Sequence, residues 1–194
     1  MYGVIKMKLY YIVFIGIILV GCAGNKHYFD ATVAQESATC TTDTFSNQIK
    51  CSMKDISTDK TGRNCTSSIS ISSNCPAPRT SMHLYVVHNK SSNRTSIELN
   101  GRVNTLDWFH PYKVLDNKGK EFTVTKVDSD IGACSSYSCS TYEYISIGLD
   151  KQYINAHIES GITMKLYGKR GEALITIPSE YVKGFKNLLK ANNM

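Results

Sequence analysis

The sequence has no apolar run long enough to cross a bilayer as a helix. The longest run, residues 9–20, has about a dozen residues, whereas a spanning helix needs roughly 20. There is also no Gly-x-Ser-x-Gly elbow, no Walker-type phosphate loop and no His-Glu-x-x-His zinc motif. The run is therefore too short to be read as a spanning helix, and the sequence carries none of the catalytic signatures that these motifs define.

A strong excess of either charge is missing as well. Charged residues make up 20% of the chain and apolar residues 42%, a globular balance that does not predict disorder. The formal net charge is +6, and +4 remains once Lys6 and Lys8 in the first 21 residues are set aside. This mild positive charge does not indicate nucleic acid as a partner, but it suits weak attraction to an anionic membrane surface.

The N-terminal segment has the pattern of an export signal. Lys6 and Lys8 precede the apolar run, and Gly21 supplies a small residue at its end. The sequence Leu19-Val20-Gly21-Cys22 resembles the lipobox of bacterial lipoproteins. The resemblance covers residues 1–23. The alternative is an uncleaved apolar anchor with an incidental cysteine, which the short run and the small residue disfavour.

The lipobox resemblance implies that Cys22 carries lipid and that the chain is cut before it. Two or three acyl chains such as palmitate, at about 0.8 kcal/mol per buried methylene, give stable anchoring. Ala23 follows where an Asp would imply retention at the inner membrane, so the resemblance points to the outer membrane. We expect a lipid-anchored protein of the cell envelope, with no cofactor besides the covalent lipid on Cys22.

The seven cysteines indicate disulfides. Lipidation uses one and leaves six, and an oxidising envelope compartment favours three bonds among them. Short loops close most readily, which favours Cys134 with Cys139, Cys40 with Cys51, and Cys65 with Cys75. The alternative is a metal site, but the spacing of the first four does not match zinc ligands, which usually lie two to four residues apart. No metal site is predicted.

The composition divides the chain into segments. Residues 1–21 are the predicted signal peptide, 22–36 a lipid-anchored tether, 37–80 a Ser/Thr-rich region stapled by disulfides, and 81–194 a β domain with a C-terminal helix. Alternating apolar residues and turn signals predict hairpins over Asn100-Gly101, residues 116–119 and residues 168–171. We expect a mainly β fold, an antiparallel sandwich-like domain; an open sheet with the C-terminal helix on one face is the alternative.

Capping signals predict two helices at the C-terminal end of this domain. Asp150 is positioned to cap a short helix whose apolar face includes Tyr153 and His157, and Ser179 to cap the last helix. Gly184 within the last helix weakens it by about 1 kcal/mol relative to alanine.

The histidines and paired carboxylates give no strong catalytic signal. His83 and His88 are five residues apart, so on one strand they would point to opposite faces. Asp128 and Asp130 suggest a calcium-binding turn, but further acidic ligands do not follow at suitable distances. His110, beside aromatic residues, is the candidate base of an envelope hydrolase acting on cell-wall material, with a nearby Asp or Ser.

The candidate contact surface comes from tyrosines and basic residues. Exposed tyrosines on a disulfide-stapled loop would present a rigid surface, and basic side chains form modest patches that are either solvated or in contact with lipid headgroups or anionic polymer. The residues are Tyr137, Tyr142 and Tyr144, the turn residues Lys169 and Arg170, and Lys183, Lys186 and Lys190 on the last helix. We expect a non-enzymatic binding or assembly module for an envelope protein or cell-wall partner; the hydrolase is the alternative.

Overall fold

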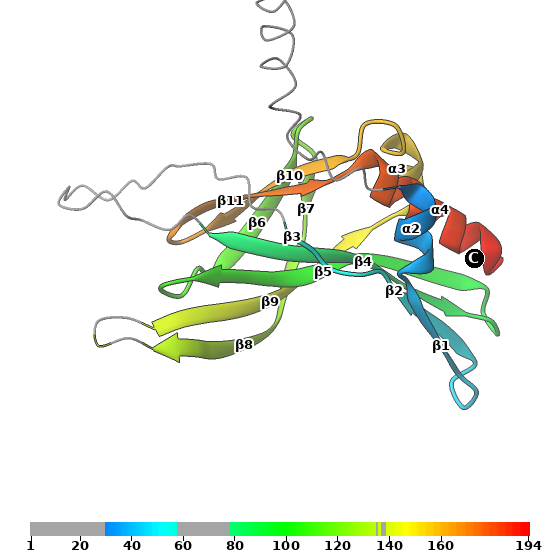
Figure 1. The fold of residues 1–194 in the computed structure, drawn as a ribbon, viewed down its shortest axis with the longest axis horizontal. Helices are drawn as coiled ribbons and strands as arrows, with labels where there is room; N and C mark the ends of the chain where they lie inside the picture. Colours follow the sequence, from blue (N-terminus) through cyan, green and yellow to red (C-terminus); the bar gives the residue numbers. More distant parts are fainter. Residues whose placement is uncertain (1–29, 58–77, 135, 137–138) are drawn as a thin grey trace, which may run out of the picture.

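The computed structural model describes residues 30–57, 78–134, 136 and 139–194 (Figure 1). Its described strands form two antiparallel sheets whose inner faces share one apolar core, and its helices gather at one end of the long axis. The predicted mainly β, sandwich-like fold is confirmed. The predictions for the signal peptide, Cys22, Cys65, Cys75 and Tyr137 fall outside the described residues.

The larger sheet has the strand order β1-β2-β4-β5-β9-β8, and β3 pairs with β4. Along β4, apolar side chains such as Leu84 and Val86 are buried, whereas the alternating Tyr85 and Val87 are half-buried on the outer face. The strands are β1 (Thr39–Asp43), β2 (Gln48–Ser52), β3 (Ile56–Ser57), β4 (Arg79–Asn89), β5 (Arg94–Thr105), β8 (Val124–Cys134) and β9 (Cys139–Leu149).

The smaller sheet has the order β11-β10-β6-β7 and contains the hairpins predicted over residues 116–119 and 168–171. Only residue 123 separates β7 from β8, so the chain passes directly from one sheet to the other at this point. The strands are β6 (Pro111–Asp116), β7 (Glu121–Phe122), β10 (Ile162–Gly168) and β11 (Gly171–Ile177).

The hairpin predicted over Asn100-Gly101 is wrong. β5 runs without a break from Arg94 to Thr105, and Asn100 pairs with His83 on one side and Ser146 on the other. A central strand makes ladder hydrogen bonds with both of its neighbours. This pairing outweighs the local preference of the Asn-Gly dipeptide for a turn. The turn lies earlier, between β4 and β5, where Asn93 takes the left-handed conformation (φ 52°).

The segment after the helix α2 (Ala31–Glu36) belongs to the larger sheet. Residues 37–80 are predicted as a loop-rich region, but β1 and β2 form a hairpin and β2 pairs with β4. Cys40 and Cys51 lie directly opposite each other in this hairpin and form the predicted disulfide. Cys51 is fully buried, so the bond joins the hairpin to the core.

The helices are α2 (Ala31–Glu36), α3 (Lys151–Ala156) and α4 (Ser179–Ala191). Asp150 caps α3 as predicted, because its carboxylate accepts the N–H of Tyr153 at 2.5 Å. The prediction for α4 is wrong by one residue, since Pro178 is the N-cap and no side chain caps the helix. Within the described residues, no helix has both the length and the apolar character needed to cross a bilayer.

The structure differs from the predicted tether at residues 31–36, which form α2. Asp30 caps this helix by accepting the N–H of Thr32 at 2.7 Å, and Ala34 is fully buried against α4. A Cβ on Gly184 of α4 would lie 2.6 Å from the carbonyl oxygen of Ala31 and 2.7 Å from the Cβ of Ala34. The glycine that weakens α4 in isolation is therefore what allows α2 to pack on it.

Candidate functional site

Two of the predicted contact tyrosines share one face of the larger sheet. Along β9, Thr141, Glu143 and Ile145 are buried toward the core, and Tyr142 and Tyr144 are half-buried on the outer face. Residues two apart on a strand point to the same side, so the alternation of β9 places both rings outward together.

The neighbouring strands flank each tyrosine with polar side chains of different character. On β5, Arg102 lies directly opposite Tyr144 and Asn104 opposite Tyr142. On β8, Asp128 lies opposite Tyr144 and Asp130 opposite Tyr142. We call these residues the tyrosine face: Arg102, Asn104, Asp128, Asp130, Tyr142 and Tyr144.

The Tyr142 ring is held in place by its neighbours. The guanidinium carbon of Arg102 lies 5.2 Å from the ring centroid, a cation–π distance. On β8, a Cβ on Gly132 would meet Oγ of Ser140 and would lie 2.5 Å from Cε2 of Tyr142, so any larger residue there would require these side chains to shift. The ring therefore packs between the backbone of Gly132 and the guanidinium of Arg102.

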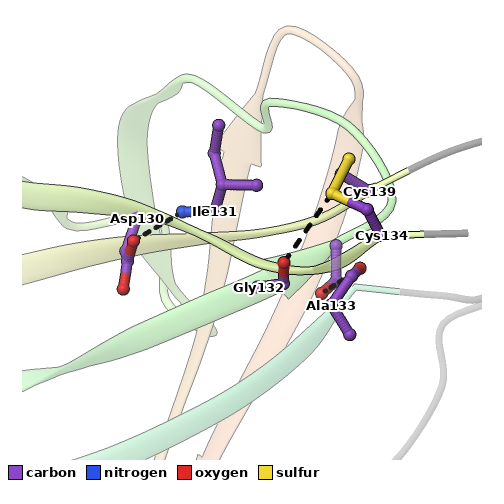
Figure 2. Close-up of a disulfide and its surroundings, with 7 residues drawn as sticks. Asp130, Ile131, Gly132, Ala133, Cys134 and Cys139 are labelled. Carbon is purple, nitrogen blue, oxygen red and sulfur yellow. Dashed lines mark hydrogen bonds between the residues drawn. A yellow bond between two sulfur atoms is a disulfide. The ribbon is translucent and has the colours of Figure 1, made fainter.

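A disulfide closes the β8–β9 hairpin (Figure 2). Cys134 and Cys139 are directly opposite on β8 and β9 and form the predicted bond. The hydroxyl of Ser140 donates to the carbonyl of Ala133 at 3.2 Å, adding a second cross-strand link at the same place. The β8–β9 hairpin is thus covalently fixed where it carries Tyr142, at the end of the molecule opposite the helices (Figure 1).

Two carboxylates of the edge strand β8 accept hydrogen bonds from backbone N–H groups of the same strand. Asp128 accepts the N–H of Ser129 at 2.7 Å, and Asp130 accepts the N–H of Ile131 at 2.8 Å, the latter drawn in Figure 2. The register with β9 shifts between Lys126 and Asp128, which makes a β-bulge. The bulge interrupts the straight ladder of β8 next to Asp128.

The outer face also carries a histidine–carboxylate pair that the sequence analysis missed. His83 Nδ1 lies 2.6 Å from Oδ1 of Asp55, and the hydroxyl of Ser81 donates to Oδ2 of the same carboxylate at 3.2 Å. The carboxylate lies between the serine and the histidine, whereas a hydrolytic triad places the histidine in the middle. The group therefore does not have the geometry of an activated serine. Asp55 is 28 residues from His83, so no local spacing signals the pair.

The predicted opposition of His83 and His88 is confirmed. His88 is buried on the inner face of β4, where its Nδ1 lies 3.0 Å from the hydroxyl of Thr95. His157 is buried as expected of a core residue, with Nδ1 2.8 Å from the carbonyl oxygen of Tyr153.

The loop around His110 is organised by a buried carboxylate. Glu143 is fully buried and accepts the N–H groups of Phe109 at 2.5 Å and His110 at 2.9 Å. It also pairs with the ammonium of Lys126 at 3.3 Å. His110 takes the left-handed conformation (φ 50°) and engages this network through its backbone; its imidazole has no hydrogen-bond partner among the described residues.

The predicted basic turn contacts the same loop. Arg170 pairs with Asp107 at 2.9 Å, and the backbone N–H of Lys169 donates to the carbonyl of His110 at 3.4 Å. Lys169 and Arg170 therefore contact the loop of residues 105–110, whereas Tyr142 and Tyr144 lie on the tyrosine face.

A buried polar group lies between β6 and α3. The carboxylate of Asp116 accepts the N–H groups of Lys118 at 2.9 Å and Lys120 at 2.8 Å. Burial favours the neutral acid, but these two bonds and the nearby Tyr153 and His157 outweigh it and hold the pKa of Asp116 below its usual value. Burial and the charge of Asp116 raise the pKa of Tyr153 well above that of a free phenol.

Among the described residues, no cluster of three or more His, Cys, Asp or Glu side chains has an arrangement that could hold a metal ion. No protein-family model, curated protein or solved structure matches this chain.

Proposed function

We propose that the protein is an exported, lipid-anchored envelope protein that acts as a non-enzymatic binding module, with the tyrosine face as its contact surface for an envelope protein. The observation that carries the proposal is the fixed position of Tyr142, between the guanidinium of Arg102 and the backbone of Gly132, beside the Cys134–Cys139 disulfide. Tyrosine and arginine are prominent among the residues that dominate binding energy in protein interfaces.

The rigidity of the surface supports this role. A side chain that is already held in one conformation loses little entropy when a partner binds. Tyr142 is restrained by packing, and the hairpin that carries it by a disulfide. Mixed cationic, amide and acidic groups around the rings supply hydrogen-bonding directions that select among partners.

Location in the envelope is supported by the lipobox at Leu19–Cys22 and by the disulfides at Cys40–Cys51 and Cys134–Cys139. Disulfides persist in oxidising compartments outside the cytosol. For the hydrolase alternative, the geometry at His110 offers no support, because its backbone and not its imidazole contacts the carboxylate of Glu143.

Site-specific cross-linking in cells tests the proposal. A photoreactive phenylalanine analogue replaces Tyr142 in the full-length protein, and cross-linked envelope proteins are identified by mass spectrometry. Tyr167 is the matched control position, because it lies half-buried on β10 in the other sheet and also has a cation near its ring, Lys165 at 5.8 Å.

We expect a discrete cross-linked species from position 142 that is absent from position 167. Its yield should fall when Arg102 is replaced by alanine, because the guanidinium orients the ring site. Identical products from both positions, or none from either, would refute the tyrosine face as the contact surface. The mass of the mature N-terminus, measured on the same material, tests lipidation at Cys22.

A further inference from the structure

The position of α2 limits how far the domain can stand from a lipid on Cys22. α2 is capped at Asp30, eight residues after Cys22, and it packs on α4 at the helical end of the molecule. A chain reaches at most about 3.3–3.6 Å per residue, so eight residues span less than about 30 Å. A bilayer that holds this lipid therefore lies close to the helical end. The surface residues of that end are then near enough to contact the bilayer.

A fully exposed phenylalanine projects from this end. Phe45 lies in the β1–β2 turn, at the same end of the long axis as the helices (Figure 1). The carboxylate of Asp43 accepts the N–H of Phe45 at 3.0 Å and the hydroxyl of Ser46 at 2.6 Å, which fixes the turn. The aromatic side chain therefore stands fully exposed on an ordered, hydrogen-bonded turn.

The β1–β2 turn is tied to the β4–β5 turn next to it. The backbone N–H of Lys90 donates to the carbonyl of Asn47 at 3.0 Å, and the side-chain amide of Asn47 donates to the hydroxyl of Ser91 at 2.7 Å. The two turns therefore form one ordered projection, and Lys90 stands beside the turn that carries Phe45.

Unpaired cations accompany the phenylalanine at this end. Lys90, Lys186 and Lys190 are exposed, and none of them makes an ion pair with any residue that the structure describes. Lys183 on the same helix differs, since it pairs with Glu159 at 3.0 Å and Glu180 at 3.2 Å. One of these ammonium groups therefore lies in the β4–β5 turn and the other two in the later part of α4.

We propose that the helical end is a membrane-contact surface for anionic lipid, in which Phe45 enters the headgroup–acyl boundary and Lys90, Lys186 and Lys190 contact the headgroups. Exposed aromatic residues and lysines are the side chains that bind anionic membrane interfaces. The inference rests on the proposed lipidation of Cys22. It orients the domain, because the tyrosine face at the opposite end then points away from the bilayer.

A lipid surface fits this end better than a protein does. Protein interfaces bury a continuous, complementary patch with an apolar centre, and lysine is depleted there. Here one aromatic side chain stands on a projecting turn among separated lysines, an arrangement that suits a soft surface carrying negative charge.

Tryptophan fluorescence tests the orientation. The full-length protein carrying Phe45→Trp and Trp108→Phe is reconstituted into vesicles of phosphatidylcholine with brominated acyl chains, with and without phosphatidylglycerol. The native protein is the matched control, because its sole tryptophan, Trp108, lies in the loop between β5 and β6 at the far end of the molecule. Phe45 is fully exposed, so its replacement leaves the core intact.

We expect the brominated lipid to remove most of the emission of the new tryptophan in vesicles that contain phosphatidylglycerol, and raised salt or Lys186→Ala with Lys190→Ala to restore part of it. The emission of Trp108 in the native protein should be unchanged. An unquenched tryptophan at position 45 in a protein whose N-terminus is lipidated overturns this inference alone. An unmodified N-terminus overturns the lipidation proposal, and the inference with it.

Discussion

Tyr142 and Gly132 are so close that the ring occupies the space in which any other residue at position 132 would place its Cβ. The contact joins the two strands of the β8–β9 hairpin at the point that the Cys134–Cys139 disulfide closes. The missing side chain at position 132 therefore leaves the space that a tyrosine on the opposite strand occupies.

Gly132→Ala should displace the Tyr142 ring and weaken partner cross-linking at position 142. Overpacking of this kind costs roughly 1–3 kcal/mol in a closed core, and the lower end applies at an exposed hairpin. Near-ultraviolet circular dichroism and urea unfolding measure the two effects. Gly148→Ala is the control, because a Cβ at this position of β9 would have nothing within 4 Å, and it should leave both unchanged. Equal behaviour of the two variants would contradict the role of Gly132.

Gly184→Ala should destabilise the protein although alanine is the better helix former. The intrinsic gain is about 1 kcal/mol, but the added carbon would lie 2.6 Å from the carbonyl oxygen of Ala31 and push α2 off α4. We expect a net loss of about 1–2 kcal/mol in urea unfolding, and faster amide exchange in α2. Asn187→Ala, at an exposed position of the same helix, should show the small gain instead. Stabilisation by Gly184→Ala would mean that α2 does not depend on this contact.

Glu143→Ala should cost about 2–3 kcal/mol, because the N–H groups of Phe109 and His110 would lose a charged acceptor in a buried place. Lys126→Ala should cost less than about 1 kcal/mol, since the lysine is half-exposed and water replaces much of the ion pair. Thermal or urea unfolding of both variants tests whether Glu143→Ala loses more stability than Lys126→Ala. A larger loss from Lys126→Ala would assign the stabilisation to the ion pair and not to the backbone bonds.

The depressed pKa of Asp116 predicts that the free energy of unfolding falls as the solution becomes acidic. An ionised carboxylate with a folded pKa below its unfolded value of about 3.9 contributes stability above that value, and the contribution is lost as the pH falls through the folded pKa. Asp116→Asn should therefore be less stable than the native protein at neutral pH, by about 1 kcal/mol, and the difference should shrink below about pH 4. Urea unfolding over a pH series measures it. A difference that stays constant across this range would show that the charge of Asp116 is not involved.

Much of the fold could be predicted because the signals are local. The Cys134–Cys139 and Cys40–Cys51 pairs lie in hairpins, where a short loop brings two cysteines opposite each other. The alternation along β9 placed Tyr142 and Tyr144 on one face, and the Asp150 cap located α3. Each of these depends on residues within a dozen positions of one another.

Features that depend on distant contacts were missed. The dipeptide Asn100-Gly101 signals a turn, but pairing with β4 and β9 on both sides keeps it in a strand. α2 has six residues and no strong periodicity, and its helical state follows from packing on α4, about 150 positions away, an interaction that no local pattern encodes. The pair of Asp55 and His83 likewise exists because β3 runs beside β4.

The carboxylates of Asp128 and Asp130 have a consequence for molecules that share a crowded two-dimensional surface. An open sheet edge invites a neighbour to add a strand, and confinement of identical chains to one plane multiplies such encounters. On β8 the N–H groups of Ser129 and Ile131 already have acceptors on their own strand, and the bulge beside them breaks the straight ladder that a second copy would need. Under the proposed lipid anchoring, copies held in one membrane plane would therefore resist pairing edge to edge through β8.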